Sequence, residues 1–156
     1  MRAALLLVLA CQSGGDSAKP PPPAADDRAD VWTTVDVLAC RYTIKMPGQA
    51  RRVDGRFESG GLVAKCVDGS SDDAGVRAAA QREVDAVASA HGGIDQSRVD
   101  LLGPANARYT VLFRDAVRLE GRAIGKGEHV HVLAGIVTSE DERHDFARML
   151  GTYKAF

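Results

Sequence analysis

Two histidines and three cysteines are the residues of this sequence whose types and spacing could support chemistry. His129 and His131 stand two residues apart in an alternating segment, so both imidazoles would project from one face of a strand. Two imidazoles could bind one metal ion, but zinc needs about three or four ligands, and no further ligand stands at a matching spacing. Arg122 is expected beside them and would repel a cation. Two interpretations remain open. The pair could form a metal site, but the favoured interpretation is a pair of surface histidines.

Motifs of hydrolytic and phosphate-binding enzymes are absent from the sequence. It contains no G-x-S-x-G nucleophile elbow, no H-E-x-x-H pair and no phosphate-cradling glycine loop. His91 is expected at a helix end, where it interacts with the helix dipole, and His144 in an exposed helical turn. We predict a protein that is not an enzyme and needs no cofactor. The alternative is an envelope enzyme or metal-binding protein that uses the surface of His129, His131 and Glu120.

The cysteines at positions 40 and 66 are expected to form a disulfide. If Cys11 anchors an exported protein, two of the three cysteines remain, and an even pair favours such a bond. Closing this loop would stabilise the fold by roughly 3 to 4 kcal/mol. Two buried free thiols are the alternative. Because Cys40 and Cys66 do not form a Cys-x-x-Cys motif, a redox-active pair is not predicted.

Cys11 ends a short apolar segment that begins at residue 3 and follows a single positive charge, Arg2. A helix needs about 20 apolar residues to span a membrane, so this segment has the proportions of a signal peptide instead. The residues Val8-Leu9-Ala10-Cys11 resemble the lipobox of bacterial lipoprotein precursors. That resemblance implies cleavage before Cys11, lipid on its sulfur and the membrane as a partner. The alternative is an ordinary secretory signal cut elsewhere, which leaves Cys11 a spare thiol.

Three segments follow from this interpretation. Residues 1–10 are the signal peptide, residues 11–30 a lipidated, proline-rich tether, and residues 31–156 one globular domain. Gln12 follows the cysteine where inner-membrane lipoproteins of enterobacteria typically have Asp. The resemblance therefore favours the outer membrane, facing the periplasm, over the inner membrane.

The overall composition is that of an ordinary globular protein. The 156 residues include 20 Lys plus Arg and 21 Asp plus Glu, and 45% are hydrophobic. No excess of basic residues is present to neutralise phosphates, so nucleic acid is not an expected partner. An envelope protein is the partner that we expect.

The domain is predicted to be α+β, with an antiparallel sheet of about six to seven strands. The alternating segments 31–37 and 40–46 differ in parity, which predicts a bulge or bend between them. If segment 61–68 pairs antiparallel with 40–46 so that the two cysteines lie opposite each other, the apolar faces of both segments agree, which supports the disulfide. Residues 49–60 are expected to be polar, with a turn at Asp54-Gly55.

Further strands are expected near residues 95–102, 106–115, 117–123 and 128–138.

The last two of these strands are predicted to form a hairpin around Gly125-Lys126-Gly127. Their apolar residues share a face only if odd positions pair with even ones, as a two-residue turn within this tripeptide allows. That register places His129, His131 and Leu133 on the solvent face.

Two helices are predicted to cover the sheet. A long one within residues 70–93 carries an apolar stripe, can begin at an Asp or Ser cap, ends at Gly92-Gly93, and leaves Glu83 solvated. A short one begins with a capping box formed by Ser139 and Glu142 and ends at Gly151.

From about residue 41 to residue 155, the order of these features resembles the PsbP-like fold. The features are an alternating strand ending in Met46-Pro47-Gly48, a long Ala-rich helix ending in Gly-Gly, a strand pair around Gly103-Pro104, and a hairpin before a short helix. The resemblance implies an α/β sandwich and a binding or assembly module. Fold alone does not give function.

Mass spectrometry of the mature protein from its host membrane tests the anchor. We expect the chain to begin at Cys11 and to carry acyl chains on it, and a Cys11→Ser variant to lose them. A wild-type protein that begins at another residue without lipid would contradict the lipobox interpretation.

Overall fold

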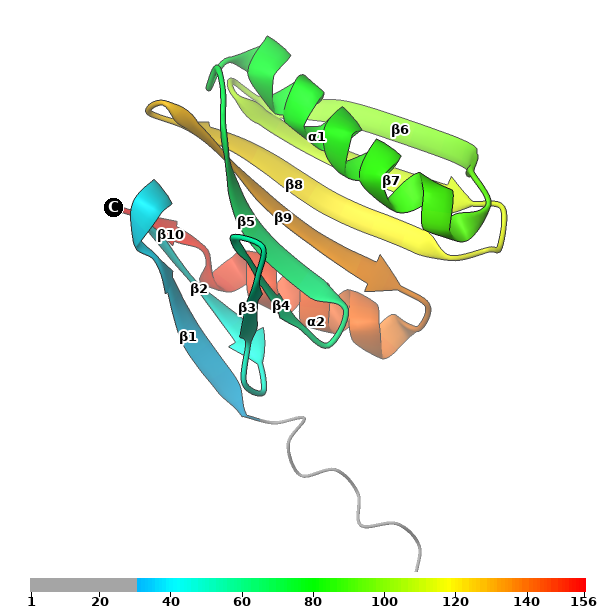
Figure 1. Ribbon diagram of the computed structural model, residues 1–156, viewed down its shortest axis with the longest axis horizontal. Coiled ribbons are helices and arrows are strands. Elements are labelled where there is room, and N and C mark those ends of the chain that lie inside the picture. The colour runs from blue at the N-terminus through cyan, green and yellow to red at the C-terminus, as the bar shows by residue number, and fades with distance from the viewer. Residues whose placement is uncertain (1–30) are drawn as a thin grey trace, which may run out of the picture.

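The computed structural model describes residues 31–156, so the predicted signal peptide, Cys11 and the tether lie outside the described residues. Two antiparallel sheets and two main helices form the domain (Figure 1). The larger sheet has the order β3-β4-β5-β9-β8-β7-β6, and the smaller has the order β1-β2-β10. The predicted α+β class, with one long and one short helix, is confirmed. No helix within residues 31–156 is long and apolar enough to cross a membrane.

The smaller sheet contains β1 (Trp32–Val37), β2 (Tyr42–Pro47) and β10 (Lys154–Ala155). The larger sheet contains β3 (Arg51–Val53), β4 (Arg56–Ser59), β5 (Leu62–Asp68), β6 (Ile94–Gly103), β7 (Asn106–Phe113), β8 (Arg118–Lys126) and β9 (His129–Val137). The helices are α1 (Asp73–Ala88) and α2 (Glu140–Thr152), with short 3-10 turns η2 (Leu38–Cys40) and η3 (Ser89–His91).

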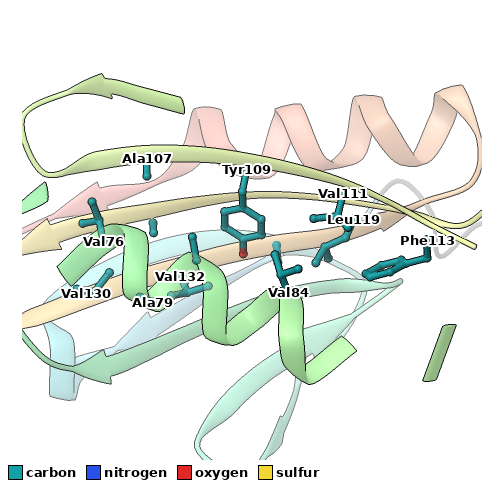
Figure 2. Close-up of a cluster of buried hydrophobic side chains, with 13 residues drawn as sticks. Val76, Ala79, Val84, Ala107, Tyr109, Val111, Phe113, Leu119, Val130 and Val132 are labelled. Carbon is teal, nitrogen blue, oxygen red and sulfur yellow. The ribbon is translucent and has the colours of Figure 1, made fainter. Parts of the chain in front are cut away.

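A first core lies between α1 and one face of the larger sheet. Alternate residues of β7, β8 and β9 are buried against the small side chains of the helix, as the alternating sequence predicts (Figure 2). Tyr109 fits because its cross-strand partner is Gly121, where a Cβ atom would overlap the phenol ring. The largest side chain of this core therefore requires the smallest residue opposite it.

The ends of α1 agree with the predicted signals, but one of its side chains does not. Asp72 caps the helix through a 2.7 Å bond from the Gly75 amide, and Gly92 follows the last turn with a left-handed backbone. Glu83, expected in solvent, is instead buried and pairs with Lys65 of β5. The expectation was wrong because a carboxylate beside the apolar stripe can turn toward a cation of the underlying sheet.

A second core lies on the opposite face of the larger sheet, where the smaller sheet and α2 cover β5 and β9 (Figure 1). β9 is consequently buried on both faces. His131 and Leu133 are fully buried, so their predicted exposure to solvent was wrong. The alternation of apolar and polar residues assigned the side chains of β9 to its two faces correctly. It does not show that a second layer covers the face that carries His131 and Leu133.

The parity change near residue 38 marks a complete reversal of the chain. The turn η2 ends at Arg41, whose left-handed backbone has φ of 57°, and β2 then pairs back on β1 with Val37 opposite Tyr42. The predicted bulge or bend is therefore the turn of a hairpin. Pairing of residues 40–46 with 61–68 was also wrong, since β2 and β5 belong to different sheets that face each other.

Residues 51–59, predicted as a polar segment, form the small hairpin β3–β4, and the predicted turn at Asp54-Gly55 joins its strands. The β8–β9 hairpin has the predicted odd-to-even register, with Ala123 opposite Val132. The two residues that connect its strands are Gly127 and Glu128. This turn lies one position further along the chain than the two-residue turns predicted within Gly125-Lys126-Gly127.

The capping box of α2 is confirmed. Ser139 accepts a bond from the Glu142 amide at 3.2 Å, and the Glu142 carboxylate accepts one from the Ser139 amide at 3.0 Å. Gly151 does not end the helix, which continues to Thr152 and is capped at Tyr153. Thr152 then accepts a bond from the Lys45 amide of β2, so the contact with the smaller sheet supports the two additional helical residues.

Candidate functional site

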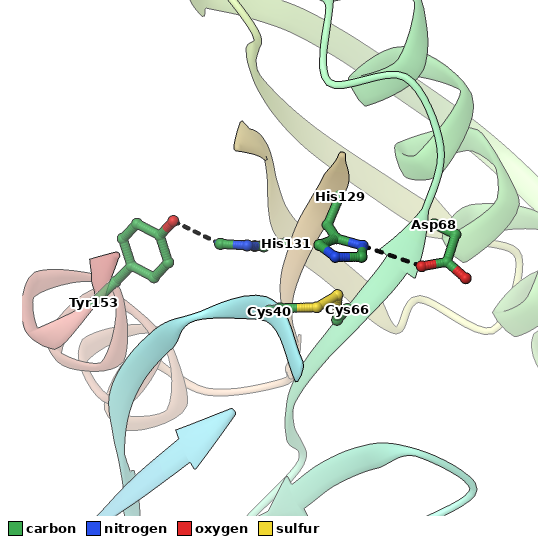
Figure 3. The surroundings of a disulfide bond; sticks show 6 residues. All are labelled: Cys40, Cys66, Asp68, His129, His131 and Tyr153. Carbon is green, nitrogen blue, oxygen red and sulfur yellow. Dashed lines mark hydrogen bonds and ion pairs between the residues drawn. A yellow bond between two sulfur atoms is a disulfide. The ribbon is translucent and has the colours of Figure 1, made fainter. Parts of the chain in front are cut away.

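The predicted disulfide joins the two sheets. Cys40 lies at the end of η2 and Cys66 near the end of β5, with their Cα atoms 6.1 Å apart (Figure 3). The bond is confirmed, although the strand pairing from which it gained support does not exist. It fastens the N-terminal hairpin to the larger sheet across the second core.

His129 lies beside this disulfide and faces the same side of the sheet. In the β5–β9 ladder His129 is the partner of Asp68, just as His131 is the partner of Cys66. The His129 Nδ1 atom donates to the Asp68 carboxylate at 3.0 Å (Figure 3). Among the described residues, the group of side chains whose ligand atoms lie close enough for one metal ion is Cys40, Cys66 and His129, all within 4.8 Å of one another.

His131 does not join His129 in a shared site. Its ring packs against Tyr42, with the ring centroids 4.4 Å apart and the planes tilted by 31°. Its Nδ1 atom lies 2.7 Å from the Tyr153 hydroxyl (Figure 3). Burial lowers the pKa of His131 to about 4, against a smaller opposing effect of the Cys40 carbonyl. The imidazole is therefore neutral at pH 7, and it serves as a packed polar link between the two sheets.

Two shallow hollows border the disulfide, and both are lined in part by Cys40 and His129. One, of about 530 Å³, is bounded by the cations Arg41 and Lys126 and by the exposed ring of Phe156. The other, of about 420 Å³, includes the exposed Leu38. His129 thus borders a hollow on each of two sides, while Cys40 is buried and the half-buried Cys66 lines the second hollow.

The structure also has a polar, charged surface that was not predicted from the sequence. This surface lies on the face of β6, β7 and β8 that points away from α1, and it lines a hollow of about 510 Å³. The strands bring Asp100 opposite Arg108, Arg98 opposite Thr110, and Glu120 opposite Thr110 on the other side. We call this the open sheet face; its charged residues are Arg98, Asp100, Arg108, Arg118, Glu120 and Arg122 on the strands and Glu140 and Arg143 on α2.

The open sheet face has five arginines and three carboxylates, an excess of two positive charges. Asp100 pairs with two of these arginines, and Glu120 pairs with two others. Within residues 31–156 no carboxylate pairs with Arg122, whose Nε atom donates to Asn106 at 3.2 Å. Burial and the neighbouring Arg108 lower the pKa of Arg122, as expected where positive charge is concentrated.

The sequence did contain a signal for this surface. Arg108, Arg118 and Arg122 all occupy even positions in strands whose odd positions are apolar. That pattern places the arginines on one face, but it does not show whether a second layer covers them.

The remaining candidates are dispersed. Glu120 lies on the open sheet face, so the surface predicted from Glu120, His129 and His131 is not formed as one unit. His91 follows α1 and pairs with Asp115 at 2.6 Å, while His144 is exposed on α2.

Comparison with known proteins supports the fold. No protein-family model matches this sequence, and a search of curated proteins found no match. The solution structure of cyanobacterial PsbP (CyanoP) from Synechocystis sp. PCC 6803 is similar, with a TM-score of 0.50 and 11% sequence identity. The match covers 88% of this chain and 100% of that one. The domain therefore has a PsbP-like fold, as the sequence suggested.

Protonation of His131 is expected to destabilise the folded protein in acid. The unfolded imidazole protonates near pH 6.5 and the folded one near 4, so the free energy of unfolding should fall by about 3 kcal/mol as pH decreases across that window. Urea unfolding at several pH values measures this loss. A His131→Gln variant should lack it and the exposed His144→Gln control should retain it; equal pH dependence in all three proteins would contradict the assignment.

Proposed function

We propose that this PsbP-like domain is a lipid-anchored binding or assembly module of the bacterial cell envelope. Cys11 would hold it at the membrane, and residues 12–30 would act as a spacer, with the outer membrane favoured. The proposal includes no catalytic step and no cofactor. It assigns the binding role to the open sheet face and the partner to another envelope protein with an acidic segment.

The observation that carries this proposal is the concentration of arginine on an uncovered part of the sheet. The smaller sheet and α2 pack over β5 and β9, whereas α1 covers only the other face of β7 and β8 (Figure 1). The chain as a whole has a net charge of −1, so this positive face is a local feature. Charged side chains left beside a hollow favour recognition of the opposite charge.

Arginine suits a protein partner because its planar guanidinium can bind a carboxylate through two hydrogen bonds. Arginine is also enriched in protein interfaces. Leu112, half-buried in the same hollow, offers an apolar contact among the charges. Arg122 has no carboxylate partner within the described residues, so an acidic side chain of the partner would complete its environment.

The alternative function, metal binding or catalysis at His129 and His131, has less support as first formulated. His131 is buried and bonded to Tyr153, so only His129 offers an accessible imidazole. The ligand-type atoms close to this imidazole are the sulfurs of Cys40 and Cys66, not a second histidine.

Photo-crosslinking in intact cells tests the proposed interface. A photoreactive residue at Thr110, on the open sheet face, should crosslink to an acidic segment of one envelope protein. Arg108→Glu with Arg122→Glu should reduce this product at least tenfold, because it reverses the charge at the centre of the face.

The matched control is Arg77→Glu with Arg82→Glu, which makes the same change of net charge on the exposed side of α1. This variant should retain the crosslink. Crosslinks to lipid or nucleic acid instead of protein, or equal loss in both double variants, would contradict the proposal.

A further inference from the structure

The disulfide, His129 and Asp68 form an arrangement that a structural crosslink does not require. A disulfide stabilises a fold without any ligand-type neighbour. Here an imidazole lies with its ligand atom within 4.8 Å of both sulfurs, and a carboxylate holds that imidazole from the other side. Carboxylate–histidine pairs of this kind orient the histidine ligands of metal ions.

From these contacts we propose that reduction of the Cys40–Cys66 disulfide creates a zinc site formed by the two cysteine sulfurs and His129. The site goes beyond the binding function proposed for the open sheet face and does not depend on it. In the oxidised protein the sulfurs are bonded to each other and bind no zinc, so the disulfide acts as the switch.

The geometry suits the ion. A tetrahedral zinc site with Zn–S bonds of about 2.3 Å and Zn–N bonds of about 2.0 Å keeps its ligand atoms roughly 3.3 to 3.8 Å apart. The His129 ligand atom already lies within 4.8 Å of both sulfurs and needs to approach them only slightly, whereas the two sulfurs, which are bonded in the oxidised protein, separate on reduction. Because His129 Nδ1 donates to Asp68, its Nε2 atom is the one left to bind zinc. Water from the adjoining hollows can occupy the fourth position.

Reduction of the disulfide needs two electrons, which a dithiol reductant, such as a thioredoxin-like envelope protein, supplies. One thiolate of the reductant attacks the half-buried Cys66 sulfur, and Cys40 leaves as a thiolate. The second reductant thiol then closes its own disulfide and releases Cys66. Two electrons and two protons are transferred overall, and Zn²⁺ displaces the two thiol protons when it binds.

The surroundings assist both steps. The hollows beside Cys40 and His129 admit reductant and metal, and Lys126 and Arg41 line one of them. These two cations outnumber the Glu128 carboxylate of the same hollow and favour the thiolate form, which is the form that binds metal. The two thiolates neutralise the charge of Zn²⁺, and the imidazole adds an uncharged ligand.

Competition between the full-length protein and a chromophoric chelator for Zn²⁺ measures the site. After reduction with a phosphine and removal of the reductant, we expect one zinc per chain, and the oxidised protein should bind none. His129→Gln and Asp68→Asn should each weaken binding about 10- to 100-fold.

The control is His91→Gln, which removes a histidine that also pairs with an aspartate but has no cysteine in its site. It should bind zinc as the wild type does. Circular dichroism of every variant, reduced and oxidised, records whether the fold persists. Equal zinc binding by the oxidised protein, reduced protein that binds none, or unchanged binding in His129→Gln would overturn the proposal.

Discussion

The structure depends on the packing of a second layer across β5 and β9. Without the smaller sheet and α2, the outer face of β9 would expose Leu133 and a histidine that carries no charge at pH 7. The layer buries these groups against Tyr42 and Phe146, and the disulfide fastens its hairpin to β5. A strand buried on both faces loses apolar contact with water on both sides, which is the main favourable contribution to folding.

The limited width of this layer explains the surfaces of the protein. Because α2 and the smaller sheet pack mainly over β5 and β9, and only Arg143 of α2 pairs with Glu120 of β8, most of the corresponding face of β6, β7 and β8 remains open to solvent and can carry charge. At the end of the layer, the turn η2 brings Cys40 next to the last residues of β5 and the first of β9. The proposed protein interface and the proposed zinc site therefore lie at two boundaries of one layer.

Sequence reasoning identified the elements that local signals determine. Asp72, the Ser139 capping box and the odd-to-even register of the last hairpin follow from short-range patterns, and all are present. It failed where distant segments meet, since alternation alone left His131 in solvent and paired β2 with β5. The disulfide was correct because it rests on the number of cysteines, but its neighbour His129 could be linked to it only after the strand order β5-β9 was known.

Amide hydrogen exchange tests most directly whether the disulfide holds the second layer in place. The exchange rates of the wild type should be compared with those of a double variant that carries both Cys40→Ser and Cys66→Ser. The bond contributes roughly 3 to 4 kcal/mol, so exchange in β1 and β2 should accelerate about 100-fold or more, and by at least tenfold more than in β7 and β8. Equal acceleration in both sheets, or none in β1 and β2, would contradict the account.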